Sequence, residues 1–390
     1  MKRYAMIPLL TLTLAACGGG SEGGDNTTTS PTLPASVEGK IEQISGNTVT
    51  VNGHQYQVES VQYLGTDIAP EKLETNLMVN ANTTSRAQTG AHIELEPTFT
   101  GRIEKIGEPK DTFTINGIEL SFAALSPRIH NGDWVMVSSL PTANAGYKVL
   151  SVISFDFDDE GMVEAEGRIS SIDFNNGTFK IGKSLTVLFD KSLVNNPKKL
   201  RNGTWVEVIG TYNEYEAELT ATEMKLKNYN DINGRGEIEG VITWVARDKS
   251  KFELNYRGTF DIHPSTKYDD GNLSSLRIGA EVEVDYISKG DTLIAKEIEF
   301  EDGDGDGDGD GDFDWDAFEF ETEGTVSNVN TDKETFMIEL KGAEKTIHID
   351  ALTRFEDNLT LESLDGEFLE VEGVIISGEY VAREIEREDD

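Results

Sequence analysis

Five copies of one short pattern, Gly-x-Ile/Val-x-x-Ile/Val, occupy most of the chain and constrain its fold more than any other feature. In every copy a second alternating segment begins within about a dozen residues of the glycine, as in Val49–Val51 and Phe252–Leu254. Asn-Gly dipeptides follow the first two of these segments, which is typical of tight β-hairpins. The pattern therefore predicts five small β-modules in tandem. Their opening glycines are Gly39, Gly101, Gly167, Gly240 and Gly324.

Later in each copy a third short strand, an irregular or briefly helical link and two further alternating strands are expected. Val206-Glu207-Val208 and Val282-Glu283-Val284 illustrate the fourth strand, and Ile298-Glu299-Phe300 illustrates the fifth. A period of two places the apolar side chains on one face of a strand and the acids on the other. A sheet with one apolar face must bury that face, and at roughly 60–70 residues a copy the economical solution is a small barrel.

We therefore predict an all-β protein of five tandem five-stranded barrels. The order of three strands, a link and two strands favours an OB-like barrel, with an SH3-like roll as the alternative. The opening glycine is expected to mark a bulge or sharp bend in the first strand. The predicted divisions are a signal peptide at 1–16, a tether at 17–36, module one at 37–97, module two at 98–156, module three at 162–227, module four at 235–301, an Asp/Gly-rich linker at 302–317 and module five at 318–388.

The repeated glycines and Val-Glu-Val strands, with Thr266–Asp270 and Thr353–Asp357, resemble the bacterial family catalogued as domain of unknown function 5666. The resemblance extends over nearly all of residues 37–388, more loosely in the first two copies. It implies exported β-rich modules that occur singly or in tandem in exported proteins and lipoproteins. It implies no particular activity.

The N-terminus combines a short basic start, an apolar stretch too short to span a bilayer, and the only cysteine of the chain, Cys17. The ending Leu14-Ala15-Ala16-Cys17 resembles the lipobox of bacterial lipoproteins. The resemblance implies cleavage before Cys17, acylation of this residue and, because Gly18 rather than Asp follows, the Gram-negative outer membrane. A plain signal peptide is the alternative. Residues 18–36 are polar and Gly-rich, and we expect them to form a flexible tether.

Acidic residues outnumber basic ones by 72 to 34, giving a net charge of −38. Such a chain repels nucleic acid and anionic lipid surfaces. Its five histidines form no zinc-binding spacing, and we find no serine-nucleophile, Walker or dinucleotide motif. No cofactor is therefore expected, with the exception of weakly bound Ca²⁺.

Two tryptophans, Trp134 and Trp205, stand at equivalent positions of the fourth strand. They are candidates for stacking on a sugar or a base, and the competing interpretation is that they cover the ends of their barrels.

The linker alternates Asp with Gly, and its carboxylates would repel one another in an extended segment. Alternating acids also present oxygens to Ca²⁺ in EF-hand-type loops, although Phe313 stands where such a loop needs Gly. The alternatives are a solvated acidic spacer and weak Ca²⁺ binding at millimolar concentration. The candidate ligands are Asp302, Asp304, Asp306, Asp308, Asp310, Asp312, Asp314, Asp316 and Glu319.

These features predict a non-enzymatic, lipid-anchored exported protein that binds or spaces an envelope glycan or protein. A cell-envelope hydrolase that uses a pair of carboxylates is the alternative. The two differ in whether acids recur at one position in several modules or cluster in a single module.

Overall fold

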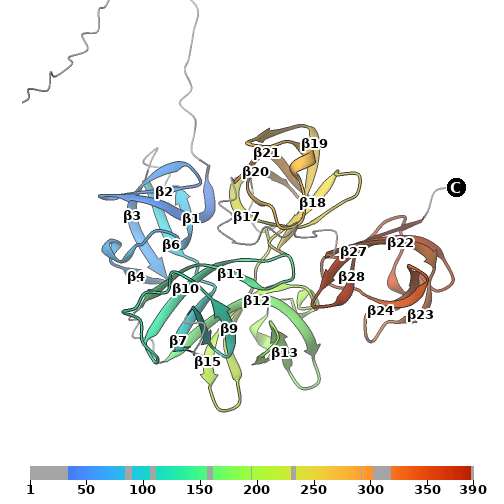
Figure 1. Cartoon of the computed structure of the whole chain (residues 1–390), viewed down its shortest axis with the longest axis horizontal. Helices are drawn as coiled ribbons and strands as arrows, with labels where there is room; N and C mark the ends of the chain where they lie inside the picture. The colour runs from blue at the N-terminus through green and yellow to red at the C-terminus, as the bar shows by residue number, and fades with distance from the viewer. Residues whose placement is uncertain are drawn as a thin grey trace, which may run out of the picture. The chain divides into compact units, whose positions relative to one another are not determined.

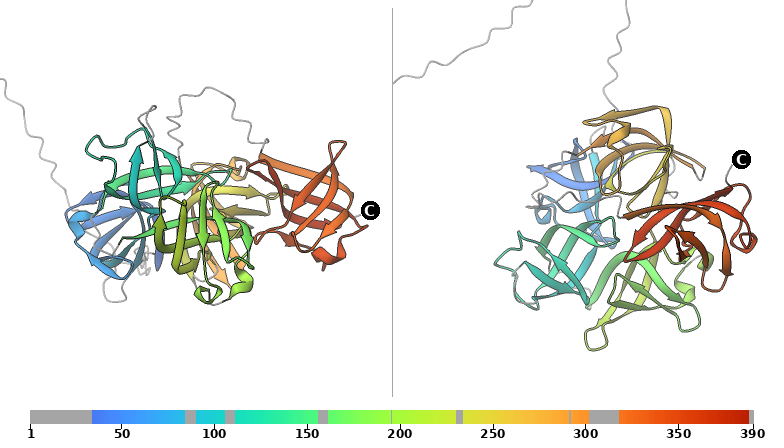
Figure 2. Two further views of the ribbon diagram at one scale, coloured as in Figure 1. Left: turned by 90° about the horizontal axis from the view of Figure 1, so that it is seen from below. Right: turned by 45° about the vertical axis from the view of Figure 1, so that its right-hand side comes forward.

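The computed structural model describes residues 34–83, 90–105, 111–155, 161–194, 196–229, 234–290, 292–301 and 318–387. It confirms the all-β prediction, because these residues form strands and short 3₁₀ turns with no α-helix among them. Figure 1 labels the strands, and the further views in Figure 2 show that each group of strands curls into a roll. In the described part of the chain we find no helix with the length and hydrophobicity needed to cross a membrane.

Module one shows how a sheet of this kind closes on itself. Its strands are β1 (Ser36–Ser45), β2 (Thr48–Val51), β3 (His54–Tyr63), β4 (Thr66–Ile68), β5 (Met78–Thr83) and β6 (Gly90–Leu95). Strands β1, β2 and β3 pair in antiparallel order, β3 pairs in parallel with β6, β6 pairs with β5, and β5 returns to β1. This circuit is a closed barrel of five strands.

Modules three and four repeat the same circuit of pairings. The strands of module three are β12 (Met162–Asp173), β13 (Thr178–Ile181), β14 (Leu185–Leu188), β15 (Trp205–Asn213) and β16 (Glu218–Leu226). Those of module four are β17 (Arg235–Val245), β18 (Lys251–Leu254), β19 (Gly258–Asp269), β20 (Glu281–Lys289) and β21 (Thr292–Phe300).

Modules two and five vary this plan. Among the described residues of module two the pairing runs β9–β8–β7–β10–β11, so β9 and β11 are its edges. In module five the first strand is divided into β22 and β23, and β26 is a short additional strand. The elements are β7 (Phe99–Lys105), β8 (Thr112–Ile115), β9 (Ile118–Ser121), β10 (Trp134–Pro141), β11 (Tyr147–Ser154), β22 (Glu319–Thr325), β23 (Ser327–Asn330), β24 (Thr335–Leu340), β25 (Ala343–His348), β26 (Arg354–Phe355), β27 (Phe368–Ile376) and β28 (Glu379–Arg387).

The expected link between the third and fourth strands contains single 3₁₀ turns. The side chain of Asn272 begins one of them by accepting a hydrogen bond from the Ser274 amide at 2.8 Å. The turns are η1 (Pro70–Lys72), η2 (Lys191–Leu193), η3 (Pro197–Lys199), η5 (Leu273–Ser275) and η7 (Leu361–Ser363).

The opening glycine is not itself the position of the bulge. In module one the register of β1 against β2 shifts between Ile41 and Gln43, after Gly39. A Cβ on Gly39 would lie 1.9 Å from Oδ1 of Asn52 in the β2–β3 turn. Gly240 has the same relation to Asn255, at 2.3 Å. In these modules glycine is needed because the turn asparagine folds back over the first strand. In module three the Cβ would instead meet Tyr147 and Ile181.

Sheets and cores both continue across module boundaries. Strand β1 pairs in parallel with β17 of module four, and β7 pairs with β12 of module three. One hydrophobic core is shared by modules two and three, and Met136 of module two packs into the core of module one. A further cluster joins modules two, three, four and five through Ala143, Trp205, Trp244, Ala246, Tyr256, Ile278, Val374, Ile376 and Val381.

Candidate functional site

The outer faces of the sheets carry a repeated row of three residues in each module, which we call the outer ladder. It consists of the residue before the opening glycine, its partner on the fourth strand, and that partner's neighbour on the fifth. Acids occur in the ladders of four modules, whereas the ladder of module two has none. The ladders are Glu38–Asn80–Glu94, Thr100–Met136–Ile153, Glu166–Glu207–Lys225, Glu239–Glu283–Glu299 and Glu323–Glu370–Glu386.

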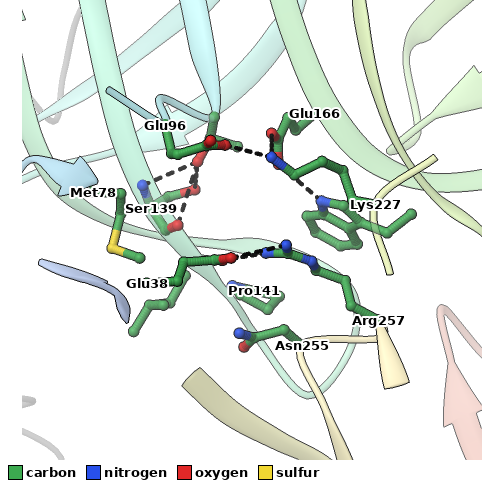
Figure 3. Close-up of a pocket in the computed structure, with 12 residues that line it drawn as sticks. Glu38, Met78, Glu96, Ser139, Pro141, Glu166, Lys227, Asn255 and Arg257 are labelled. Carbon is green, nitrogen blue, oxygen red and sulfur yellow. Dashed lines mark hydrogen bonds and ion pairs between the residues drawn. The ribbon is translucent and has the colours of Figure 1, made fainter. Parts of the chain in front are cut away.

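The ladder of module three is buried around one ammonium group. Lys227 Nζ lies 3.2 Å from Glu166 and 3.3 Å from Glu207, and it also contacts Glu96 at the end of module one. In Figure 3 this lysine reaches between Glu96 and Glu166. Three carboxylate oxygens, one from each glutamate, lie within 4.8 Å of one another, close enough to hold a metal ion. The ammonium of Lys227 already supplies the positive charge there.

Burial sets the protonation of this cluster. The pKa of Glu166 is raised by burial, although Lys227 opposes the change. Burial and the carboxylates of Glu207 and Glu166 raise the pKa of neighbouring Glu164 well above its usual value. The hydroxyl of Tyr63 lies 2.6 Å from Glu164 Oε2. The pKa of Lys227 is raised because the surrounding carboxylates outweigh its burial. Burial thus disfavours the charged form of Glu164, while the neighbouring carboxylates favour the charged form of Lys227.

The hollow beside this cluster is too small for a substrate. Its volume is about 30 Å³, which is room for roughly two water molecules. On the other side of the hollow Arg257 forms a bidentate ion pair with Glu38 of module one, as Figure 3 shows. The guanidinium also lies 4.5 Å from the centre of the Tyr229 ring. The arrangement joins modules one, three and four by charge and leaves no room for a reacting molecule.

A second buried network joins modules three, four and five. Arg383 is 1% exposed and its Nε lies 2.7 Å from Glu253 of module four. The same guanidinium lies 3.3 Å from Asp350, which accepts a hydrogen bond from Arg168 of module three at 2.7 Å. Burial alone would raise the pKa of Asp350, but the two arginines hold it below its usual value. Two acids and two arginines thus form a buried row of ion pairs whose charges balance.

The ladder of module four is only partly neutralised. Lys40 of module one donates to Glu301 at 2.7 Å, and its backbone amide donates to Glu239 at the same distance. Glu283, between Glu239 and Glu299, contacts no cation among the described residues. Burial and the surrounding carboxylates raise the pKa of Glu283 to about 9. Nearby, His54 of module one lies 3.0 Å from Glu237.

The two candidate tryptophans have different surroundings. Trp205 is 4% exposed, its Nε1 donates to Glu166 at 3.0 Å, and its ring stacks on Tyr256 with centroids 6.3 Å apart. It therefore contributes to the contact between modules and offers no open stacking surface. Trp134 is half-buried and borders a surface groove of about 470 Å³ between modules two and three.

The remaining candidate residues fall largely outside the described chain. This applies to Cys17 and to every aspartate from Asp302 to Asp316 in the linker. Glu319 is described and begins β22, with an exposed side chain. The cations that neutralise the ladders were missed by sequence reasoning, because Lys227 and Arg257 lie in no motif and Lys40 occupies a variable position of the opening Gly-x-Ile pattern. The sequence did contain one usable signal: the ladder of module two has no acidic residue, which indicates that this face packs against another module.

Comparison with known proteins matches two of the modules to the model of a described family. The model of the family described as "Domain of unknown function (DUF5666)" matches residues 239–299 and 323–386, so the DUF5666-like repeat is confirmed in modules four and five. No curated protein matches the chain significantly in sequence. A solved structure, described as a multidomain protein with nucleic acid binding domains from Streptococcus pneumoniae TIGR4, is 12% identical over 67% of this chain and 72% of its own, with a TM-score of 0.14. A similarity this low supports no argument about ligands.

Proposed function

Since modules four and five are DUF5666-like repeat domains, we propose that the chain is a lipid-anchored exported protein that binds or spaces components of the cell envelope without catalysing a reaction. Its five modules are OB-like barrels. The strand order 1-2-3-5-4, closed on strand 1 with a parallel pair between strands 3 and 5, supports this assignment in modules one, three and four.

One observation carries the proposal: cations from other modules repeatedly cover the acidic outer faces. Arg257 of module four pairs with Glu38, Lys40 of module one with Glu239, and Arg247 of module four with Glu370. Breaking a buried pair costs about 3–5 kcal/mol because it leaves an unpaired charge. The acids recur in several modules, and buried ones such as Glu38 and Glu239 form ion pairs that hold modules together. Such contacts suit a protein that holds several modules in contact for binding or spacing.

The sequence around Cys17 supports the membrane anchor. Several acyl chains hold a protein stably on a membrane, whereas one chain alone does so weakly. The resemblance to the lipobox, in which Gly18 rather than Asp follows the cysteine, supports an outer-membrane location. The net charge of −38 opposes nucleic acid as a partner and leaves an envelope glycan or protein.

Weak Ca²⁺ binding by the linker is part of this proposal. Its aspartates alternate with other residues from Asp302 to Asp316, and the site would work at the millimolar concentrations at which extracellular modules bind Ca²⁺. Protection of the linker from proteolysis by millimolar CaCl₂, but not by NaCl of equal ionic strength, would support it. Equal protection by both salts would leave only charge screening.

A hydrolase is the second candidate because two carboxylates, Glu104 and Glu214, border the groove beside Trp134 from different modules. Glycosidases use such a pair of acids. Release of reducing sugar from any polysaccharide by the wild-type chain, abolished in Glu104→Gln, would establish this alternative and refute the non-enzymatic proposal.

The anchoring part is tested with Cys17→Ser in the full chain. We expect the wild type to partition into the detergent phase with a lipid adduct visible by mass spectrometry, and the variant to lose both. A variant that keeps both would refute the lipid anchor, because the chain has no other thiol to accept the lipid.

A further inference from the structure

The groove that Trp134 borders combines aromatic rings with polar groups. It has a volume of about 470 Å³, within the range of ligand-binding sites in proteins. Module two contributes Arg102, Glu104 and Trp134, and module three contributes Tyr212, Glu214 and Tyr215 among other residues. Because β7 pairs with β12, the two walls belong to one continuous sheet.

Tyr215 is the most exposed large aromatic side chain among the described residues, at 92% exposure. It lies in the turn between β15 and β16, where its backbone amide donates to Asn213 Oδ1 at 3.0 Å. No packing inside the barrel requires a tyrosine there, and an exposed aromatic ring is costly to hydrate. An exposed ring beside a groove is instead typical of a surface that meets a partner.

The polar groups of the groove select the class of ligand. Arg102 lies over the Trp134 ring, 5.3 Å from its centre, and donates to the Gly132 carbonyl at 2.8 Å. Tyr212 lies near Glu104 and Glu214, and after burial these carboxylates are the main cause of its raised pKa. Two carboxylates oppose a phosphate, sulfate or uronate. They are good acceptors for hydroxyl groups.

We propose that this groove binds a neutral glycan chain, whose C–H faces stack on Trp134 and Tyr215 while its hydroxyls donate to Glu104 and Glu214. The guanidinium of Arg102 donates to ring or hydroxyl oxygens of the same sugars. A sugar fits this combination because it has an apolar face and a polar rim. The inference rests on the proposed binding role and names the ligand class of that role.

The test uses the full chain and two neutral probes, cellohexaose and chitohexaose, in titration calorimetry. We expect saturable binding of at least one probe and a loss of affinity of tenfold or more in Tyr215→Ala, whose exposed side chain can be removed without unfolding. Trp134→Ala should weaken binding similarly. Phe368→Ala is the matched control, because Phe368 opens the fourth strand of module five, is 52% exposed and lies outside the groove.

The absence of binding to both probes, or equal binding by wild type and Tyr215→Ala, would overturn the glycan site. Tighter binding of a lysine-rich peptide than of either sugar would also overturn it, because the carboxylates would then select a cation. These outcomes leave the membrane anchor intact, since anchoring is measured separately on Cys17→Ser. Hydrolysis of the probes would instead refute the non-enzymatic role while keeping the groove as a sugar site.

Discussion

The fourth-strand glutamates of modules three and four occupy the same ladder position but meet different surroundings. Glu207 lies 3.3 Å from the ammonium of Lys227. Glu283 instead lies between two further glutamates, Glu239 and Glu299, and its pKa is raised to about 9. Strand alternation places a carboxylate on the outer face in both modules. Whether a lysine or further glutamates surround it then decides whether this carboxylate is ion-paired or protonated.

The largest effect is expected from removing the cation of module three. Lys227→Met leaves Glu96, Glu166 and Glu207 without their shared partner in a site where the lysine side chain is only 5% exposed. We expect the free energy of unfolding to fall by about 3–5 kcal/mol at pH 7, measured by urea denaturation. Adding Glu166→Gln should restore part of this loss.

Lys225→Met is the matched control, because Lys225 lies two residues before Lys227, near the end of β16, and 3.9 Å from the same Glu207 but is 59% exposed. An exposed pair contributes about 0–1 kcal/mol, so this variant should be nearly neutral. Equal losses in the two lysine variants would show that burial does not distinguish them, and the comparison of ladders would fail.

The sequence predicted the barrel interiors well, because alternation is a local property. Val206 and Val208 are buried as the period of two requires, and so are Val282 and Val284. Asn52 and Gly53 form the expected hairpin turn with positive φ at both positions. The pairing of the first and fourth strands, which closes modules one, three and four, depends on the same alternation, since only one register buries the apolar face.

The polar contacts between modules could not be predicted from the sequence. The pair between Glu38 and Arg257 joins residues 219 positions apart, and no spacing rule connects them. Trp134 and Trp205 show the same limit. They are equivalent in the repeat, yet Tyr256 of module four covers only Trp205. Exposure at a repeated position is decided by packing against other modules.

The next prediction concerns the ladder of module four. Glu283→Gln removes a carboxyl group that burial and four neighbouring acids disfavour in its charged form. Glutamine keeps the shape of the protonated acid, so we expect the variant to be more stable than wild type by about 1–2 kcal/mol at pH 8.

The pH dependence gives the same test a second readout. An unfolded glutamate loses its proton near pH 4.5, whereas Glu283 in the folded chain keeps its proton to about pH 9. Between these values the folded state binds more protons, so this residue makes stability fall as pH rises. Unfolding measured from pH 5 to pH 9 should show a shallower decline in Glu283→Gln. An unchanged profile would mean that Glu283 is ionised when folded.

The smallest effect is expected at the exposed edge of the same acidic face. Lys267 on β19 lies 3.4 Å from Glu297, and the two side chains are 73% and 42% exposed. Water and salt screen such a pair, and holding two long side chains together costs conformational entropy. Lys267→Ala should therefore change the free energy of unfolding by no more than about 0.5 kcal/mol, with little difference between low and high salt in urea titrations. A loss as large as that of Lys227→Met would show that the acidic face of module four depends on every cation near it. Burial would then not be what separates the two ladders.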